Sequence, residues 1–210
     1  MTAEVLLLIE KLTALAQGGM AYSPNVYDRD RYNKLRALTA ELYGLLCVPR
    51  AGSSGALDYL ALFPVEDGYR TPKIDVRAFV VRGDSVLLVH EKVDECWALP
   101  GGWADIGETP TQNVVKEVWE ESGYAAQVVR LLALLDNSCH QHGSVRWWTY
   151  KAFYLCTVSG EPSRGTMETL GADFFPITKL PRLSVGRVTE AQIQRLYRMV
   201  QTDERTPWID

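Results

Sequence analysis

One stretch, Trp97–Tyr124, limits the fold of this chain more than any other, because it specifies both ends of a helix. Thr109 can cap the N-terminus of that helix, Pro110 suits its first position, and Gln112 can complete a capping box. Gly123 is the residue type that commonly ends a helix in the left-handed conformation. The stretch therefore predicts a helix that begins after Thr109 and ends at Gly123.

The predicted helix has two chemically different faces. Steps of about 100° per residue place its apolar and its acidic side chains on opposite sides. The apolar side carries Val114, Val115, Val118 and Trp119, and the acidic side carries Glu117, Glu120 and Glu121. Clustered glutamates are usually a solvated surface, so the flanking residues must decide whether this face has a function.

The acidic face is a candidate metal site. Like charges three and four residues apart destabilise a helix by about a few tenths of a kcal/mol per pair, and Glu108 adds a carboxylate on the preceding loop. A divalent cation would remove this repulsion. Because the ligands are oxygens, with no Cys or His among them, they suit Mg²⁺ or Mn²⁺. Magnesium typically lies between carboxylates and substrate phosphates, so we expect a phosphate compound as the partner.

The residues in and before the predicted helix keep a spacing that is typical of one enzyme family. They are Gly102, Glu108, Lys116, Glu117, Glu120, Glu121 and Gly123. This order resembles the Nudix box, the signature of the Nudix hydrolases. It departs from the family pattern at one defined position, where Lys116 replaces an arginine and lacks the planar fork that can hold a carboxylate by two bonds.

The resemblance implies a fold, a reaction and a set of metal ligands. The fold would be the Nudix α/β/α sandwich with a mixed sheet, over roughly residues 72–202. The reaction would be hydrolysis of a nucleoside diphosphate linked to another group. The implied ligands are Glu117, Glu120 and Glu121, with help from Glu108, and the backbone carbonyl of Gly102.

Two glutamates are candidates for the general base that accepts the proton of the attacking water. Glu120 lies within the box and is the preferred candidate. Glu168 follows a loop between Gly160 and Gly165, where mobility would allow closure over the substrate.

Three further residues are candidates for substrate binding. Arg77 could hold a phosphate with its guanidinium fork, and Trp103 could stack on a nucleobase. His140, or its neighbour His142, could contact a phosphate from a loop between two predicted strands. The alternative for these histidines is a solvated loop without a function.

The N-terminal part of the chain predicts a helical domain. Apolar residues recur at helical spacing over residues 3–17, which end at Gly18 and Gly19, and a second helix can begin at a capping Asp28. We expect a helical domain over residues 1–50, a linker rich in Gly, Ser and Pro over 51–71, and the main domain over 72–210. The hairpin either packs on the main domain or forms a homodimer, because two helices alone bury little core.

The rest of the chain mixes strands and helices. A β-hairpin is predicted from Lys73 to Val89, and further strands over residues 126–135 and 146–158. A final helix begins at Thr189, which is followed by a second capping-box pattern. This order favours a mixed sheet covered by helices.

Four segments outside the box are similar to a Nudix subgroup with an N-terminal helical domain. They are residues 74–77, 150–156, 168–175 and 180–184. The subgroup includes CDP-choline pyrophosphatases, so the resemblance implies hydrolysis of CDP-choline to CMP and phosphocholine, with ADP-ribose as the alternative substrate. A rival from another class is a Nudix-fold module that senses a nucleotide without hydrolysing it. Lys116 alone favours that rival, and the box glutamates oppose it.

Composition excludes several other classes of protein. The 210 residues include 47% apolar residues, enough to fill a core, and carry a net charge of -4 without a basic face for nucleic acid. The N-terminal apolar run is interrupted by Glu10 and Lys11, so we expect neither a signal peptide nor a membrane span. The four cysteines form no CxxC pair, which is typical of free thiols in a reducing compartment and predicts a cytoplasmic protein.

Overall fold

The computed structural model describes residues 3–47, 69, 71–105, 107–140, 148–163 and 169–210. The chain divides into two compact units, Met1–Thr71 and Pro72–Asp210. The predicted linker lies almost entirely outside the described residues, so the predicted domain boundaries stay a prediction. No helix among the residues described is long and apolar enough to cross a membrane.

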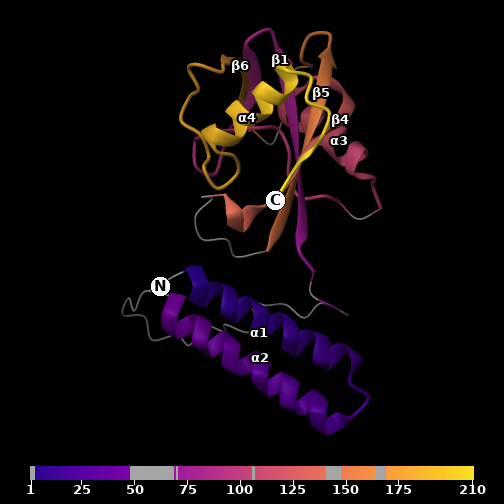
Figure 1. Ribbon diagram of the computed structural model, residues 1–210, viewed down its shortest axis with the longest axis vertical. Coiled ribbons are helices and arrows are strands. Elements are labelled where there is room, and N and C mark those ends of the chain that lie inside the picture. Colours follow the sequence, from indigo (N-terminus) through magenta and orange to yellow (C-terminus); the bar gives the residue numbers. More distant parts are fainter. Residues whose placement is uncertain (1–2, 48–68, 70, 106, 141–147, 164–168) are drawn as a thin grey trace. The chain divides into compact units, whose positions relative to one another are not determined.

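The N-terminal unit is a hairpin of two long helices, α1 (Ala3–Tyr22) and α2 (Val26–Cys47), as predicted (Figure 1). The prediction that Gly18 and Gly19 end the first helix is wrong, because α1 continues through both. The reason is packing between the helices. A Cβ atom on Gly19 would lie 2.5 Å from the ring of Tyr32, so this glycine allows α2 to approach α1 closely.

The second helix begins earlier than predicted. Asp28 lies inside α2, where its carboxylate forms an ion pair of 2.6 Å with Arg31 one turn later. Asn25 supplies the capping oxygen instead, since its Oδ1 accepts the N–H of Tyr27 at 2.8 Å. The spacing of apolar residues predicted the helix correctly, but the predicted cap, Asp28, is wrong, and Asn25 is the capping residue.

The C-terminal unit contains the predicted mixture of strands and helices. Its strands are β1 (Lys73–Arg82), β2 (Ser85–Glu91), β3 (Trp97–Ala98), β4 (Ala125–Asp136), β5 (Thr149–Ser159), β6 (Thr169–Pro176) and β7 (Trp208–Ile209). Its helices are α3 (Pro110–Ser122), the short 3-10 turn η2 (Asn137–Cys139) and α4 (Glu190–Gln201). The described strands form one sheet in the order β3-β2-β1-β5-β4-β7, with β6 beside β2. Parallel and antiparallel pairs both occur, so the sheet is mixed.

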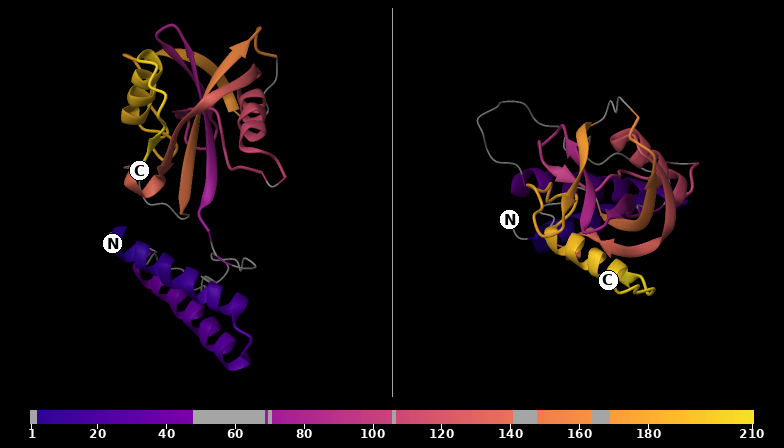
Figure 2. Two further views of the ribbon diagram at one scale, coloured as in Figure 1. Left: turned by 45° about the vertical axis from the view of Figure 1, so that its right-hand side comes forward. Right: turned by 90° about the horizontal axis from the view of Figure 1, so that it is seen from above.

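Helices cover both faces of this sheet (Figure 2). On one face, Val114 and Val118 of α3 pack with Val76 in one apolar cluster. On the other face, Ile193 of α4 belongs to a second cluster that includes Phe79 of β1. Residues of opposite parity on β1 thus enter different cores, and the predicted α/β/α sandwich is confirmed.

Strand β1 connects the two halves of the sheet. Most of its length pairs in parallel with β5, and only its last two residues pair with β2. Residues 100–104 occupy the rest of the second edge, because the Ala78 N–H donates to the Pro100 carbonyl at 2.8 Å and the Val76 N–H to the Gly102 carbonyl at 2.9 Å. The loop before α3 is thereby attached to the centre of the sheet.

The predicted strands are present, and three further strands, β3, β6 and β7, were not predicted. β4 extends over the predicted residues 126–135, and β5 covers the described part of the strand predicted over 146–158. β6 was missed, although Leu170, Ala172 and Phe174 alternate along it with smaller or polar residues. The two preceding glycines, Gly160 and Gly165, favoured the prediction of a loop in this region.

Candidate active site

The helix α3 has the ends that its sequence predicts. The Thr109 side chain accepts the N–H of Gln112 at 3.2 Å, and Oε1 of Gln112 accepts the N–H of Thr109 at 2.8 Å. At the other end Gly123 adopts φ 73°, in the left-handed region, and its N–H donates to the Trp119 carbonyl. The Gly123 carbonyl then accepts the N–H of Ser163 at 2.9 Å. These bonds set the position at which the glutamates of α3 are presented.

The faces of α3 differ from the predicted division. Val114 and Val118 are buried, but Val115 is only partly covered and Trp119 is half exposed. Glu121, assigned to the acidic side, is buried instead. The reason is its position on the helix wheel, next to Val118 and Val114, where it faces the loop attached to β1.

The loop between β3 and α3 closes directly over two of the glutamates. The Gly101 N–H donates to Oε2 of Glu121 at 2.7 Å. A Cβ on Gly102 would lie 2.9 Å from Oε1 of Glu117, so the absence of a side chain there leaves room for that carboxylate. At Gly101 a Cβ would lie 2.0 Å from the Val76 carbonyl oxygen, in addition to a φ of 142°. Glycine is therefore required at position 101 by backbone contacts, whereas a side chain at position 102 would displace the Glu117 carboxylate.

Charge accumulates where these groups meet. The pKa of Glu121 is raised to about 8, mainly by burial and also by the neighbouring Glu117 and Glu91, against the opposing effects of Arg77 and the Gly101 N–H. A buried carboxyl group next to two more carboxylates suits a cation, which would favour its ionised form. In the part of the chain that the structure describes, no three acidic, His or Cys side chains already converge as a metal cluster. The donor set is nevertheless all oxygen and fits a hard divalent ion.

Lys116, which stands where the family pattern has arginine, connects the loop to α3. Its Nζ lies 2.5 Å from Oδ2 of Asp105 and 3.6 Å from Oε1 of Glu108. The hydrogen bond to Asp105 raises the pKa of Lys116, and Glu108 and Glu120 act in the same direction. Glu108 is thus placed beside the acidic face, with Lys116 between it and solvent-exposed Asp105.

Arg77 lies beneath the loop rather than at the surface. Its Nε and Nη2 donate to the two carboxylate oxygens of Asp75 at 2.6 and 3.1 Å, and its Nη1 donates to the Leu99 carbonyl at 3.1 Å. The side chain is buried. Its predicted contact with a substrate phosphate stays a prediction, but its guanidinium fork faces Asp75.

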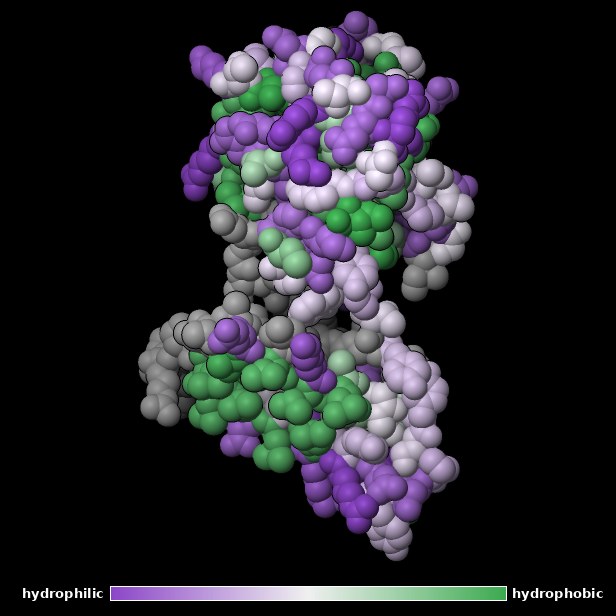
Figure 3. Space-filling model, in the orientation of Figure 1, coloured by the Kyte–Doolittle hydropathy of each residue, from purple (hydrophilic) through white to green (hydrophobic). Residues whose placement is uncertain are grey.

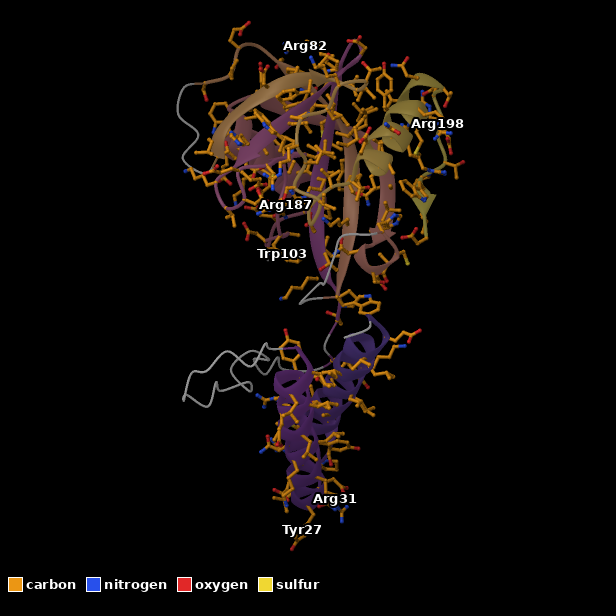
Figure 4. The ribbon with its side chains drawn as sticks, turned by 90° about the vertical axis from the view of Figure 1, so that its left-hand side faces the viewer. Tyr27, Arg31, Arg82, Trp103, Arg187 and Arg198 are labelled. Carbon is orange, nitrogen blue, oxygen red and sulfur yellow. The ribbon has the colours of Figure 1, made fainter. Side chains whose placement is uncertain are left out.

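The remaining candidates lie in different surroundings. Trp103 is 49% exposed, at the rim of the C-terminal unit next to Asp75 of β1 (Figure 4). His140 contacts the C-terminal end of the chain, where its Nε2 lies 2.9 Å from Oδ2 of Asp210 and its ring packs edge-on against Trp208. The predicted Glu168 lies outside the described residues, as does His142.

Sequence reasoning missed three buried charged residues beside the site. Asp75, Lys151 and Glu91 are all buried and lie near Arg77. Asp75 and Lys151 lie between apolar or aromatic residues of their strands, so a charge in such a run was the available signal, whereas Glu91 lies at the end of β2 between His90 and Lys92.

Comparisons with known proteins agree with this architecture. Residues 71–196 match the NUDIX domain model, and residues 3–45 match a model described as a UDP-X-like, N-terminal oligomerisation domain. YjhB of Bacillus subtilis (strain 168), provisionally named an ADP-ribose pyrophosphatase, is 40% identical over 202 residues, which are 96% of this chain and 94% of that protein. An ADP-ribose pyrophosphatase of Methanocaldococcus jannaschii is 31% identical over 120 residues, 55% of this chain and 69% of that protein.

Two solved structures extend the comparison. A UDP-X diphosphatase superimposes with a TM-score of 0.63 at 31% identity and covers 99% of this chain and 98% of its own. An ADP-ribose pyrophosphatase from Streptococcus suis 89-1591 has a TM-score of 0.61 at 35% identity and covers 67% of this chain and 100% of its own. The fold, the position of α3 under the loop that holds Gly101 and Gly102, and the matches to both domain models agree. This chain belongs to the Nudix hydrolases and is a pyrophosphohydrolase.

Proposed function

We propose that this enzyme uses Mg²⁺, or Mn²⁺, to hydrolyse the pyrophosphate bond of a nucleoside diphosphate linked to a second group. The observation that carries the proposal is the arrangement of the Gly101 and Gly102 backbone over Glu117 and Glu121. Carboxylates and a backbone carbonyl at one place form the oxygen-rich surroundings in which a magnesium phosphate complex binds.

The proposed metal ligands are the carboxylates of Glu117, Glu120 and Glu121, with Glu108 and the Gly102 carbonyl. The Gly102 carbonyl already accepts one hydrogen bond from Val76, and its second lone pair is the one proposed for the metal. A bound divalent ion polarises phosphoryl oxygens and lowers the pKa of bound water. Glu120, which is partly exposed on α3, is proposed as the general base that accepts the proton of the attacking water.

The substrate choice rests on two kinds of support. The names of the relatives favour ADP-ribose, whereas CDP-choline, which would give CMP and phosphocholine, is favoured only by the similarity of segments outside the box. In either case half-exposed Trp103, beside the glycine loop, offers an aromatic surface for the base. Arg77 and His140 already have acidic partners in Asp75 and Asp210, so Trp103 is the first substrate contact to test.

A substrate panel with and without Mg²⁺ tests this proposal. Release of nucleoside monophosphate from ADP-ribose, CDP-choline, a UDP-linked sugar and nucleoside triphosphates would be followed by chromatography. We expect metal-dependent cleavage of at least one linked diphosphate, and a large loss of kcat/KM in Glu117→Gln, which removes a charge but little volume. Glu204→Gln, an exposed glutamate beyond α4, is the matched control.

Two outcomes would contradict the proposal. If Glu117→Gln hydrolysed at the rate of the unchanged protein, the metal assignment would be wrong. If the protein bound a nucleotide in calorimetry but cleaved nothing in the panel, the rival interpretation as a nucleotide-sensing module would replace the enzyme.

We also propose that the hairpin forms a homodimer through its apolar surface. The hairpin surface consists of Leu8, Leu12 and Leu15 on α1 and Leu38, Leu42 and Leu45 on α2, all of which are exposed. On each helix these leucines follow one another at steps of four and three, so they form a continuous stripe, and Figure 3 shows apolar side chains gathered on one face of the hairpin. The match to an oligomerisation domain supports a second copy as the occupant.

A cytoplasmic location is part of the proposal. The described cysteines Cys96, Cys139 and Cys156 are free thiols, as is typical of proteins in a reducing compartment. Comparing thiol titration of the protein as isolated and after reduction tests this point, because equal counts are expected.

A further inference from the structure

Three charged side chains form a buried cluster at the base of the site. The buried cluster consists of Asp75 and Arg77 of β1 and Lys151 of β5, of which Lys151 is 2% exposed. Arg77 holds Asp75 by two hydrogen bonds, and Nζ of Lys151 lies 3.8 Å from Oδ2 of the same carboxylate. Asp75 and Lys151 face each other directly in the parallel pairing of the two strands.

The buried cluster also connects two loops. Lys151 donates to the carbonyls of Gly186, at 3.2 Å, and Arg187, in the segment before α4. Arg77 donates to the Leu99 carbonyl, two residues before the glycine whose N–H holds Glu121. A continuous series of polar contacts therefore leads from the segment before α4, through both strands, to the loop that covers the glutamates.

Stability alone does not explain such a cluster. Taking charged groups out of water is costly, and buried ion pairs are often no more stabilising than apolar side chains of similar size. Here all three positions belong to strands whose other inward residues are apolar, including Phe79 and Phe153. Apolar replacements could not reproduce the hydrogen bonds to loop carbonyls, and of these the bond from Arg77 to Leu99 is the one that reaches the loop over the glutamates.

We infer that Arg77 and Asp75 are positioning residues for the metal site. Asp75 holds the guanidinium in place, and Arg77 fixes the Leu99–Gly102 loop at the distance from α3 that brings Gly101 to Glu121. The inference rests on the proposed function, because it assumes that the metal binds between this loop and α3. It also gives Arg77 a role that needs no contact with substrate, in keeping with its burial.

The first test compares Arg77→Lys with Arg82→Lys in the full-length protein. A lysine at position 77 keeps the charge but lacks the planar fork that holds both carboxylate oxygens of Asp75 while a further N–H reaches the Leu99 carbonyl. Arg82 is the matched control, since it is an arginine of the same strand whose guanidinium stacks on Phe174 at the far end. Asp75→Asn is the second variant, and it removes the partner that orients Arg77.

Three readouts are combined. Calorimetry of Mn²⁺ binding without substrate is expected to show a loss of affinity of about tenfold or more in Arg77→Lys and Asp75→Asn, because residues that orient ligands typically contribute that much. Hydrogen exchange of the peptide that contains residues 99–104 should be faster in both variants without metal. The Mg²⁺ concentration for half-maximal hydrolysis should rise, and excess Mg²⁺ should restore part of kcat. Arg82→Lys should change none of these.

Two results separate failure of this inference from failure of the proposed function. Unchanged Mn²⁺ affinity together with unchanged exchange of residues 99–104 in both variants would overturn the positioning role. If the unchanged protein showed no metal-dependent hydrolysis, the proposed function would fail, whereas faster exchange of that peptide in both variants would still support a role in holding the loop.

Discussion

Replacing leucines of the hairpin surface by lysine should convert the proposed dimer to a monomer. Leu15 is 64% exposed and Leu38 is 62% exposed within one copy. Burying a whole leucine side chain contributes about 2 kcal/mol, so each exposed fraction can contribute about 1 kcal/mol when a second copy covers it. In a two-fold dimer each position occurs twice, so Leu15→Lys with Leu38→Lys removes about 4 kcal/mol, or about a thousandfold in Kd.

Sedimentation velocity over a wide range of protein concentration is the assay. The double variant should sediment as a monomer at concentrations where the unchanged protein is a dimer, with the same circular dichroism spectrum. Val93→Lys is the control, because Val93 is 84% exposed in the C-terminal unit and should leave the dimer intact. A monomeric unchanged protein at all concentrations, or an equal Kd for the double variant, would refute the reasoning.

Three further predictions concern Lys151, the glycine pair Gly123 and Gly107, and Trp103. Burial lowers the pKa of Lys151 from 10.5 to about 8, so between these pH values the unfolded chain binds a proton that the folded chain has lost. The free energy of unfolding should therefore rise by up to ~3 kcal/mol from pH 8 to 10.5. Urea titrations of Lys151→Met should not show this rise. Gly123→Ala should destabilise the protein by about 2 kcal/mol or more, because the new Cβ would lie 2.5 Å from the Ser163 carbonyl oxygen in addition to the strain of the left-handed backbone. In the control Gly107→Ala the new Cβ meets no atom within 4 Å, so only the backbone strain of about 1 kcal/mol is expected. Thermal unfolding measures both losses of stability. Trp103→Ala should raise KM for the preferred substrate several-fold with little change in Tm, and an unchanged KM would exclude stacking on this residue.

Features that depend on local chemistry were predictable from the sequence. The caps of α3 and of α4 involve residues three positions apart, so Thr109 with Gln112 and Thr189 with Gln192 could be recognised directly. The spacing of the glutamates on α3 is local as well. The fold class followed from the order of such elements and from the resemblance to a family with this signature.

Features that depend on contacts between distant residues were not predictable in the same way. Gly19 belongs inside α1 because Tyr32 of the other helix packs on it. Glu121 is buried because a loop attached to β1 lies over it, and this attachment joins residues that are 20 or more positions apart. Strand alternation places Arg77 and Asp75 on one face, but the sequence does not show that the loop through Leu99 covers that face and buries the pair.

The close approach of Gly101 to β1 has a consequence for how this enzyme can diversify. A side chain at position 101 would meet the Val76 carbonyl, so the path of the backbone over β1 depends on glycine there, and a side chain at position 102 would displace the Glu117 carboxylate. The next residue, Trp103, is 49% exposed, so a substitution there leaves these backbone contacts intact. Substitutions at position 103 and in the residues after it can therefore change the preferred substrate while the reaction stays the same. In this way one catalytic framework can serve many substrates.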